Sequence, residues 1–176
     1  SPMPPFITST MQQDAFRKLS FQTKKTMKVA QELYEGVNLG AEFGGSHGLI
    51  TYMRTDSLRI STDAANAAQA YIISKYGTEF YPSRKRVFKT SGASQDAHEA
   101  IRPTYIELTP AAVKDSLTRE QFRLYQLIWK RFVASRMQPA KYETTSVKIA
   151  AGEYRFTVSA SKVLFEGFRT VYTESG

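Results

Sequence analysis

The stretch TREQFRLYQLIWKRFVASRM, residues 118–137, contains the longest helical pattern in the chain. Thr118 and Gln121 have the spacing of a capping box, which predicts a helix over residues 119–137. Its large apolar side chains recur at intervals of three and four positions: Phe122, Tyr125, Trp129, Phe132 and Val133. Such a stripe is typical of a helix that packs into a core, so we expect a domain built around this helix.

Shorter helical patterns occur on its N-terminal side. Apolar spacing and capping residues predict helices within 8–19, 20–36 and 61–77. Thr8, Ser9 and Thr10 are candidate N-caps of the first, and Ser61 or Thr62 of the third. The second ends at Gly36, and its apolar side comprises Met27, Ala30, Leu33 and Tyr34. Residues 36–48 hold five of the ten glycines, which predicts a flexible loop.

The pattern changes after Pro139. Residues 142–173 alternate and are rich in valine, threonine and aromatic residues, which predicts three strands with a hairpin turn at Gly152. The fold class we expect is α+β: a predominantly helical domain with a short tyrosine-bearing strand, followed by an antiparallel β segment. We place the boundary between residues 1–139 and 140–176.

The tyrosine-bearing strand is predicted within GLITYMRTDS, residues 48–57. If residues 49–54 are extended, Ile50, Tyr52 and Arg54 share one face, with the last two about 7 Å apart at Cα. A guanidinium can bind the phosphate that a tyrosine attacks, and it favours the nucleophilic tyrosinate. Spacing alone also fits an amphipathic sheet edge, which is the more common arrangement.

The segment QDAHEAIRPT, residues 95–104, offers a second pair of anion-binding side chains. We expect about two helical turns ended by Pro103, with His98 and Arg102 on one face and able to grip one anion. The alternative is a polar histidine near a helix end with no ligand. Glu99 is expected to pair with a neighbouring basic side chain.

Charge suggests a polyanionic partner. The 24 Lys and Arg exceed the 16 Asp and Glu, giving a net charge of +8 and a pI near 9.7. Candidate phosphate contacts are Arg54, Arg84, Lys85, Arg86, Arg123 and Lys130. A basic surface without a specific partner would have the same composition.

Several classes of site are not indicated. Without cysteine there are no disulfides or thiolate metal sites, and the chain has only two histidines, His47 and His98. No phosphate-binding glycine loop and no DxD-type carboxylate cluster occurs, so neither a nucleotide site nor a metal site is expected. No apolar stretch is long enough for a membrane span and no signal peptide is evident, so we expect a cytoplasmic protein.

Five segments, in order, resemble bacterial type IA DNA topoisomerases over nearly the whole chain: PPFITSTMQQDA, KKTMKVAQELYEG, GLITYMRTDS, QDAHEAIRPT and LYQLIWKRFVASRMQPA. The resemblance implies relaxation of negatively supercoiled DNA without ATP, through transient single-strand cleavage and strand passage. It implies that Tyr52 forms a 5′-phosphotyrosyl intermediate and that Arg54 positions the scissile phosphate. His98 and Arg102 are expected to contact DNA, and Gln31 and Glu35 to approach the active site.

The resemblance also implies partners outside this chain. Mg²⁺ is expected in the complete enzyme through a Toprim domain that this chain lacks, with no cofactor in the chain itself. Residues 1–139 resemble the gate domain that carries the nucleophile, and residues 140–176 the start of a β-rich arch. We expect a nucleoid-associated monomer that acts on single-stranded or negatively supercoiled DNA together with the remaining domains, and a fragment unable to complete the reaction alone.

Two other functions remain open. The chain could be a DNA-binding module only, held by its basic side chains. It could also be a tyrosine recombinase, which uses tyrosine, arginine and histidine. Tyr52 precedes His98 and Arg102, however, whereas a recombinase nucleophile usually follows them, and this order counts against that class.

Overall fold

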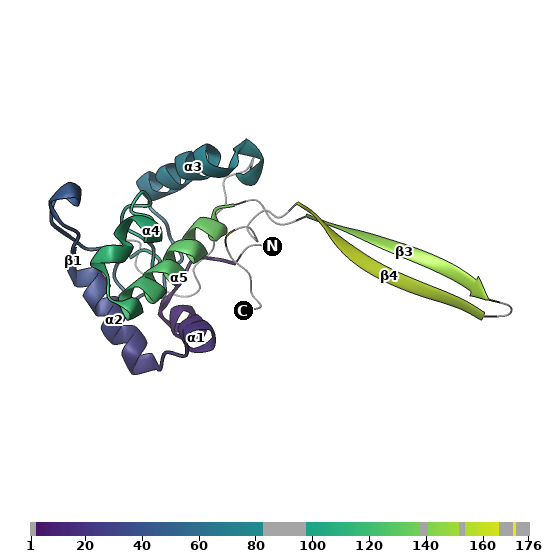
Figure 1. The fold of residues 1–176 in the computed structure, drawn as a ribbon, viewed down its shortest axis with the longest axis horizontal. Coiled ribbons are helices and arrows are strands. Elements are labelled where there is room, and N and C mark those ends of the chain that lie inside the picture. The colour runs from purple at the N-terminus through teal and green to yellow at the C-terminus, as the bar shows by residue number, and fades with distance from the viewer. Residues whose placement is uncertain (1–2, 83–97, 138–140, 152–153, 166–170, 172–176) are drawn as a thin grey trace.

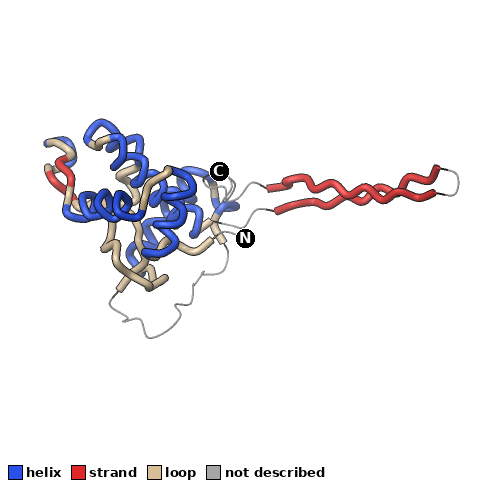
Figure 2. Tube along the Cα trace, turned by 90° about the horizontal axis from the view of Figure 1, so that it is seen from below, coloured by secondary structure: helices blue, strands red, loops and turns tan. Residues whose placement is uncertain are grey.

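The computed structural model describes residues 3–82, 98–137, 141–151, 154–165 and Val171. The helices form one body, and a long two-stranded hairpin extends away from it (Figure 1; Figure 2 shows the same arrangement from below). This confirms the expected α+β class with a predominantly helical domain. None of the helices in the described part of the chain has the length and hydropathy of a membrane span.

The described elements follow one another along the chain as α1 (Thr8–Leu19), α2 (Thr23–Glu35), β1 (Val37–Asn38), η1 (Ala41–Phe43), β2 (Ser46–His47), α3 (Thr62–Tyr76), η2 (Thr78–Phe80), α4 (Pro110–Val113), η3 (Lys114–Ser116), α5 (Arg119–Ser135), β3 (Lys141–Ala151) and β4 (Tyr154–Phe165).

Helix α5 is the centre of the core, as its sequence predicts. The Thr118–Gln121 capping box forms, and the helix packs against α1, α2 and α4. Tyr125 and Trp129 are buried, and the indole Nε1 of Trp129 donates a hydrogen bond to the carbonyl of Ile106 at 3.0 Å. Phe122 is only half-buried, so the buried stripe begins one turn later than expected.

The start of α1 differs from the prediction. The N-cap is Ile7, and all three expected capping residues lie inside the first turn. Thr10 Oγ1 accepts a hydrogen bond from the Ile7 N–H at 3.0 Å, as the N3 residue of a capping box does. Thr8 instead donates its hydroxyl to the carbonyl of Met53 at 2.6 Å, because the tyrosine-bearing segment lies against this helix end. The predicted ends of α2 at Gly36 and of α3 at Ser61 and Gly77 are confirmed.

Residues 36–48 are more ordered than a flexible loop. Strands β1 and β2 form a short antiparallel hairpin with η1 at its tip. At its end, a Cβ on Gly48 would lie 2.7 Å from the carbonyl oxygen of Tyr34, so only glycine lets the chain pass the end of α2. Leu49 N–H then donates to the carbonyl of Leu33 at 2.8 Å. The tyrosine-bearing segment is therefore fixed directly to α2.

The prediction of a helix through residues 98–102 is wrong. These residues are extended, and isolated bridges join Ile101 to Phe6 and Pro103 to Ile50. Pro103 disfavours a helical conformation at the residue before it. The N–H groups of Ala100 and Ile101 donate to the distant carbonyls of Arg59 and Phe6 instead of to a helical turn. The preceding residues 94–97 lie outside the described part of the chain.

The C-terminal segment forms an antiparallel hairpin. Strands β3 and β4 pair from Lys141 and Phe165 to Ala151 and Tyr154, with a register irregularity between Lys141 and Tyr142. Two of the three predicted strands are thus present. The turn at Gly152 and the region of the third strand fall outside the described residues, apart from Val171.

Candidate active site

Tyr52 does not lie on a strand, in contrast to the expectation. The segment makes one isolated bridge, between Ile50 and Pro103. Because proline has no N–H to donate, the pairing cannot continue as a regular ladder. The predicted alternation holds for Tyr52 and Arg54, which are exposed on either side of buried Met53, but fails for Ile50, which is buried in the core.

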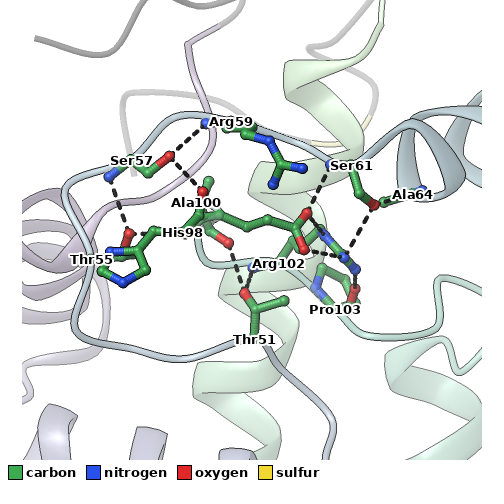
Figure 3. A network of polar contacts seen from close by, with 11 residues as sticks. Thr51, Thr55, Ser57, Arg59, Ser61, Ala64, His98, Ala100, Arg102 and Pro103 are labelled. Carbon is green, nitrogen blue, oxygen red and sulfur yellow. Dashed lines mark hydrogen bonds and ion pairs between the residues drawn. The ribbon is translucent and has the colours of Figure 1, made fainter. Parts of the chain in front are cut away.

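Three hydroxyl groups hold the loop that bears Tyr52. Thr51, Thr55 and Ser57, here called the hydroxyl cluster, donate to the consecutive carbonyls of residues 100, 99 and 98, at 2.7, 2.9 and 2.9 Å (Figure 3). On the opposite side, Thr8 Oγ1 accepts the N–H of Thr55 at 2.8 Å. The backbone around Tyr52 is thereby held between α1 and the segment that bears His98.

The extended segment is itself fixed by an ion pair. Arg102 donates from Nε and Nη2 to the two carboxylate oxygens of Glu99, each at 2.9 Å, and the Ser61 N–H donates to Glu99 Oε1 at 2.8 Å (Figure 3). Arg102 Nη1 donates to the carbonyl of Pro103 at 3.0 Å. The expected basic partner of Glu99 is confirmed as Arg102. Because Nε, Nη1 and Nη2 are each hydrogen-bonded inside the protein, Arg102 acts here as a structural clamp.

These contacts set the ionisation of Glu99. Burial acts to raise the pKa of Glu99, but hydrogen bonds from Arg102 and the Ser61 N–H, with the positive charges of Arg102 and Arg59, outweigh it. The pKa of Glu99 therefore lies below its ordinary value of 4.5. The carboxylate stays ionised at neutral pH and keeps the clamp closed.

This shift predicts a pH-dependent effect of Glu99→Gln. A carboxyl group with a lowered folded-state pKa stabilises the protein above its unfolded pKa, and this stabilisation is lost as the pH falls through the folded value. We expect Glu99→Gln to lower the free energy of unfolding by about 1.5 kcal/mol at pH 7. The difference should shrink below pH 4.5 in urea titrations at several pH values. The exposed control Glu42→Gln should show no such trend, and a pH-independent loss in Glu99→Gln would contradict the assignment.

A groove opens beside Tyr52, with a volume of about 330 Å³. Its walls are formed by Tyr34, Ile50, Thr51, Tyr52, Arg54, Thr55, His98, Glu99 and Thr104. Three residues singled out from the sequence, Tyr52, Arg54 and His98, thus line one groove. Within the described part of the chain, their side chains make no hydrogen bond or ion pair.

The other candidates lie elsewhere. Arg102 does not line the groove, and Gln31 donates to Glu35 at 2.7 Å on α2, outside the lining. Arg123 lies over the ring of Phe21, 5.5 Å from its centroid, and Lys130 is half-buried. The remaining basic candidates, residues 84–86, fall outside the described residues.

Tyr34 is a groove residue that the sequence pattern misplaced. It was expected on the buried side of α2, but 41% of it is exposed. Its ring meets that of Tyr52 edge to face, with 5.2 Å between centroids and 68° between planes. One feature of the sequence could have indicated that Tyr34 borders the groove. Tyr34 lies at the end of a helix that is connected to Tyr52 by a glycine-rich segment.

The groove does not fit a magnesium ion. No three His, Asp or Glu side chains converge anywhere in the described part of the chain. Glu99 is the carboxylate of the groove, and its oxygens already accept from Arg102 and Ser61. The described groove residues therefore offer no ligand set for this ion.

The sequence and fold match known proteins. The DNA topoisomerase family matches residues 1–176. The chain belongs to the DNA topoisomerase family. This topoisomerase segment is 53% identical over 175 residues to DNA topoisomerase 1 from the Temecula1 and 9a5c strains of Xylella fastidiosa, covering 98% of this chain and 21% of each relative.

A solved structure agrees with the family assignment. Full-length topoisomerase I from Thermotoga maritima is 42% identical to the topoisomerase segment, with a TM-score of 0.81. The match covers 97% of this chain and 27% of that one. The segment therefore spans about a fifth of the length of the curated relatives and about a quarter of the solved relative.

Proposed function

We propose that this chain is the nucleophile-bearing part of a type IA DNA topoisomerase and that Tyr52 attacks a DNA phosphodiester. The observation that most supports this is the placement of the phenol. Tyr52 is 48% exposed, its hydroxyl is not hydrogen-bonded within the described residues, and Arg54 and His98 line the same groove. The hydroxyl cluster holds the backbone on both sides of this side chain.

The proposed step is a transesterification. The phenolic oxygen of Tyr52 forms a bond to phosphorus while the bond from phosphorus to the 3′ oxygen breaks. The phenol loses its proton, and the departing 3′ oxygen gains one to become a hydroxyl. The 5′-phosphate stays on Tyr52. Attack by the 3′-hydroxyl reverses the step, and one phosphodiester replaces another, so no ATP is consumed.

Arg54 and His98 are proposed to hold the scissile strand. The exposed guanidinium of Arg54 can donate two parallel hydrogen bonds to non-bridging phosphate oxygens. The exposed imidazole of His98 can contact the backbone phosphate beside it. Gln31 and Glu35 lie at the C-terminal end of α2, next to Tyr34, and are proposed to border the site.

The rest of the machinery is proposed to lie in other parts of a longer, monomeric enzyme. A Toprim domain would hold Mg²⁺, residues 1–139 would form the gate, and residues 140–176 would begin an arch. Strand passage through the gate would relax negatively supercoiled DNA in the nucleoid. The piece alone would then be unable to complete the reaction.

The polarity of the covalent link tests this proposal. Residues 1–176 would replace the matching segment of Xylella fastidiosa DNA topoisomerase 1, and the chimaera would be incubated with Mg²⁺ and a single-stranded oligonucleotide. A label at the 3′ end should appear on the protein, and a label at the 5′ end should appear on a shorter free strand with a 3′-hydroxyl. The unmodified Xylella enzyme serves as the positive control.

The same experiment separates the alternatives. Attachment of the 5′-labelled strand would indicate a 3′-phosphotyrosyl link, as in a tyrosine recombinase, and would overturn the assignment. Retention of DNA without any covalent product, while the control cleaves, would indicate a module that only binds DNA.

A further inference from the structure

Tyr34 exposes an aromatic surface beside the proposed nucleophile. It lies on the last turn of α2, where the neighbouring Leu33 is fully buried. Within the described residues its hydroxyl makes no hydrogen bond. A partly exposed ring at the margin of a helix's buried face adds little to the core, so its exposed surface is available to a ligand.

Tyr34 is held in place relative to the segment that bears Tyr52. Its helix is joined to the tyrosine-bearing segment by the hydrogen bond from Leu49 to Leu33 and by the close passage of Gly48 past the carbonyl of Tyr34. Tyr52 contacts it edge to face, with 5.2 Å between the ring centroids. An edge-to-face pair leaves aromatic surface uncovered, and both rings line the groove.

A strand in this groove would bring a base close to Tyr34. If Tyr52 and Arg54 contact one phosphate, the adjacent nucleotides lie within a few ångströms of that phosphate. Bases of single-stranded DNA stack on aromatic side chains irrespective of their sequence. Besides the nucleophile itself, the described groove residues with aromatic rings are Tyr34 and His98, and His98 is the one proposed to contact the phosphate.

We propose that Tyr34 is a nucleobase-stacking residue, which binds an unpaired base next to the scissile phosphate and so aligns the strand for attack by Tyr52. This inference rests on the proposed function of Tyr52. It identifies the bound species as unpaired DNA, because a base held in a duplex has no free face to offer. If Tyr34 only supported Tyr52 by packing, removal of a DNA base would change the cleavage rate equally with and without the Tyr34 ring.

The test removes bases one at a time. In the chimaera with the Xylella enzyme, cleavage of an intact oligonucleotide is compared with cleavage of oligonucleotides that have one abasic site at each of the two positions on either side of the cut. We expect one position at which base removal lowers the cleavage rate about tenfold, the scale of one base–aromatic stack. Tyr34→Phe should keep this dependence, and Tyr34→Leu should abolish it.

The quantity that decides the test is the cleavage rate of the abasic oligonucleotide divided by that of the intact oligonucleotide. A general loss of activity in Tyr34→Leu, through displacement of Tyr52, cancels in this ratio. Phe16→Ala, which removes another exposed aromatic ring on α1, should leave the base dependence unchanged. Equal ratios in the unsubstituted chimaera and Tyr34→Leu would overturn the stacking role while cleavage through Tyr52 persists. Absence of any Tyr52-linked adduct would instead overturn the proposed function.

Discussion

Tyr52→Phe should abolish the covalent DNA adduct while leaving the fold and non-covalent DNA binding intact. The substitution removes the attacking oxygen and nothing else, because the ring can keep its contact with Tyr34 and the hydroxyl has no hydrogen-bond partner among the described residues. Loss of a nucleophile costs several orders of magnitude, so we expect cleavage to fall at least about 10⁴-fold. The free energy of unfolding should change by no more than about 0.5 kcal/mol.

The measurement is adduct formation in the chimaera, with DNA binding followed in parallel. Tyr105→Phe is the matched control, because Tyr105 is also exposed but lies outside the groove lining. It should retain full cleavage. Residual adduct in Tyr52→Phe would mean that another residue is the nucleophile.

Asp14→Ala should produce the largest loss of stability. Asp14 and Arg131 form an ion pair with an Nη1 to Oδ2 distance of 3.2 Å, and their side chains are 7% and 6% exposed. Arg131 also donates to the carbonyl of Pro4 and lies 4.6 Å from the ring centroid of Phe6. Removing the carboxylate breaks this buried ion pair, which costs about 3–5 kcal/mol.

Urea denaturation of the 176-residue chain checks this value. Arg17→Ala is the control, because Arg17 also contacts Asp14, at 2.7 Å, but its side chain is 60% exposed. Its loss should cost less than about 1 kcal/mol. The double variant Asp14→Leu with Arg131→Met should be more stable than Asp14→Ala, since neither charge remains buried. A double variant as unstable as Asp14→Ala would contradict the charge explanation.

The helices could be predicted where local signals decide them. Thr118 with Gln121, Ser61, and the glycines at positions 36 and 77 mark helix ends through contacts within a few residues. The segment 98–103 could not be predicted in this way. Its extended form depends on hydrogen bonds to Phe6 and Arg59, whose distance in sequence hides them from any local pattern.

In the site, too, residues marked by local motifs could be predicted, whereas contacts between distant parts of the sequence could not. Tyr52, Arg54 and His98 were identified from motifs, and the structure brings them to one groove. The hydroxyl cluster was not identified, because its acceptors are backbone carbonyls 41 to 49 positions away and no side-chain pattern marks them. Tyr34 was misplaced because helical spacing alone cannot show that the margin of an apolar face borders a groove.

The hydroxyl cluster has a consequence for how this site can change. Thr51, Thr55 and Ser57 donate to main-chain oxygens, which every amino acid provides. The exposed side chain at position 98 can therefore be exchanged without releasing the loop that holds Tyr52, whereas Ala100 is fully buried and Glu99 is committed to its clamp. Natural variation or engineering at position 98 can thus alter the contact with the DNA strand while Tyr52 keeps its position.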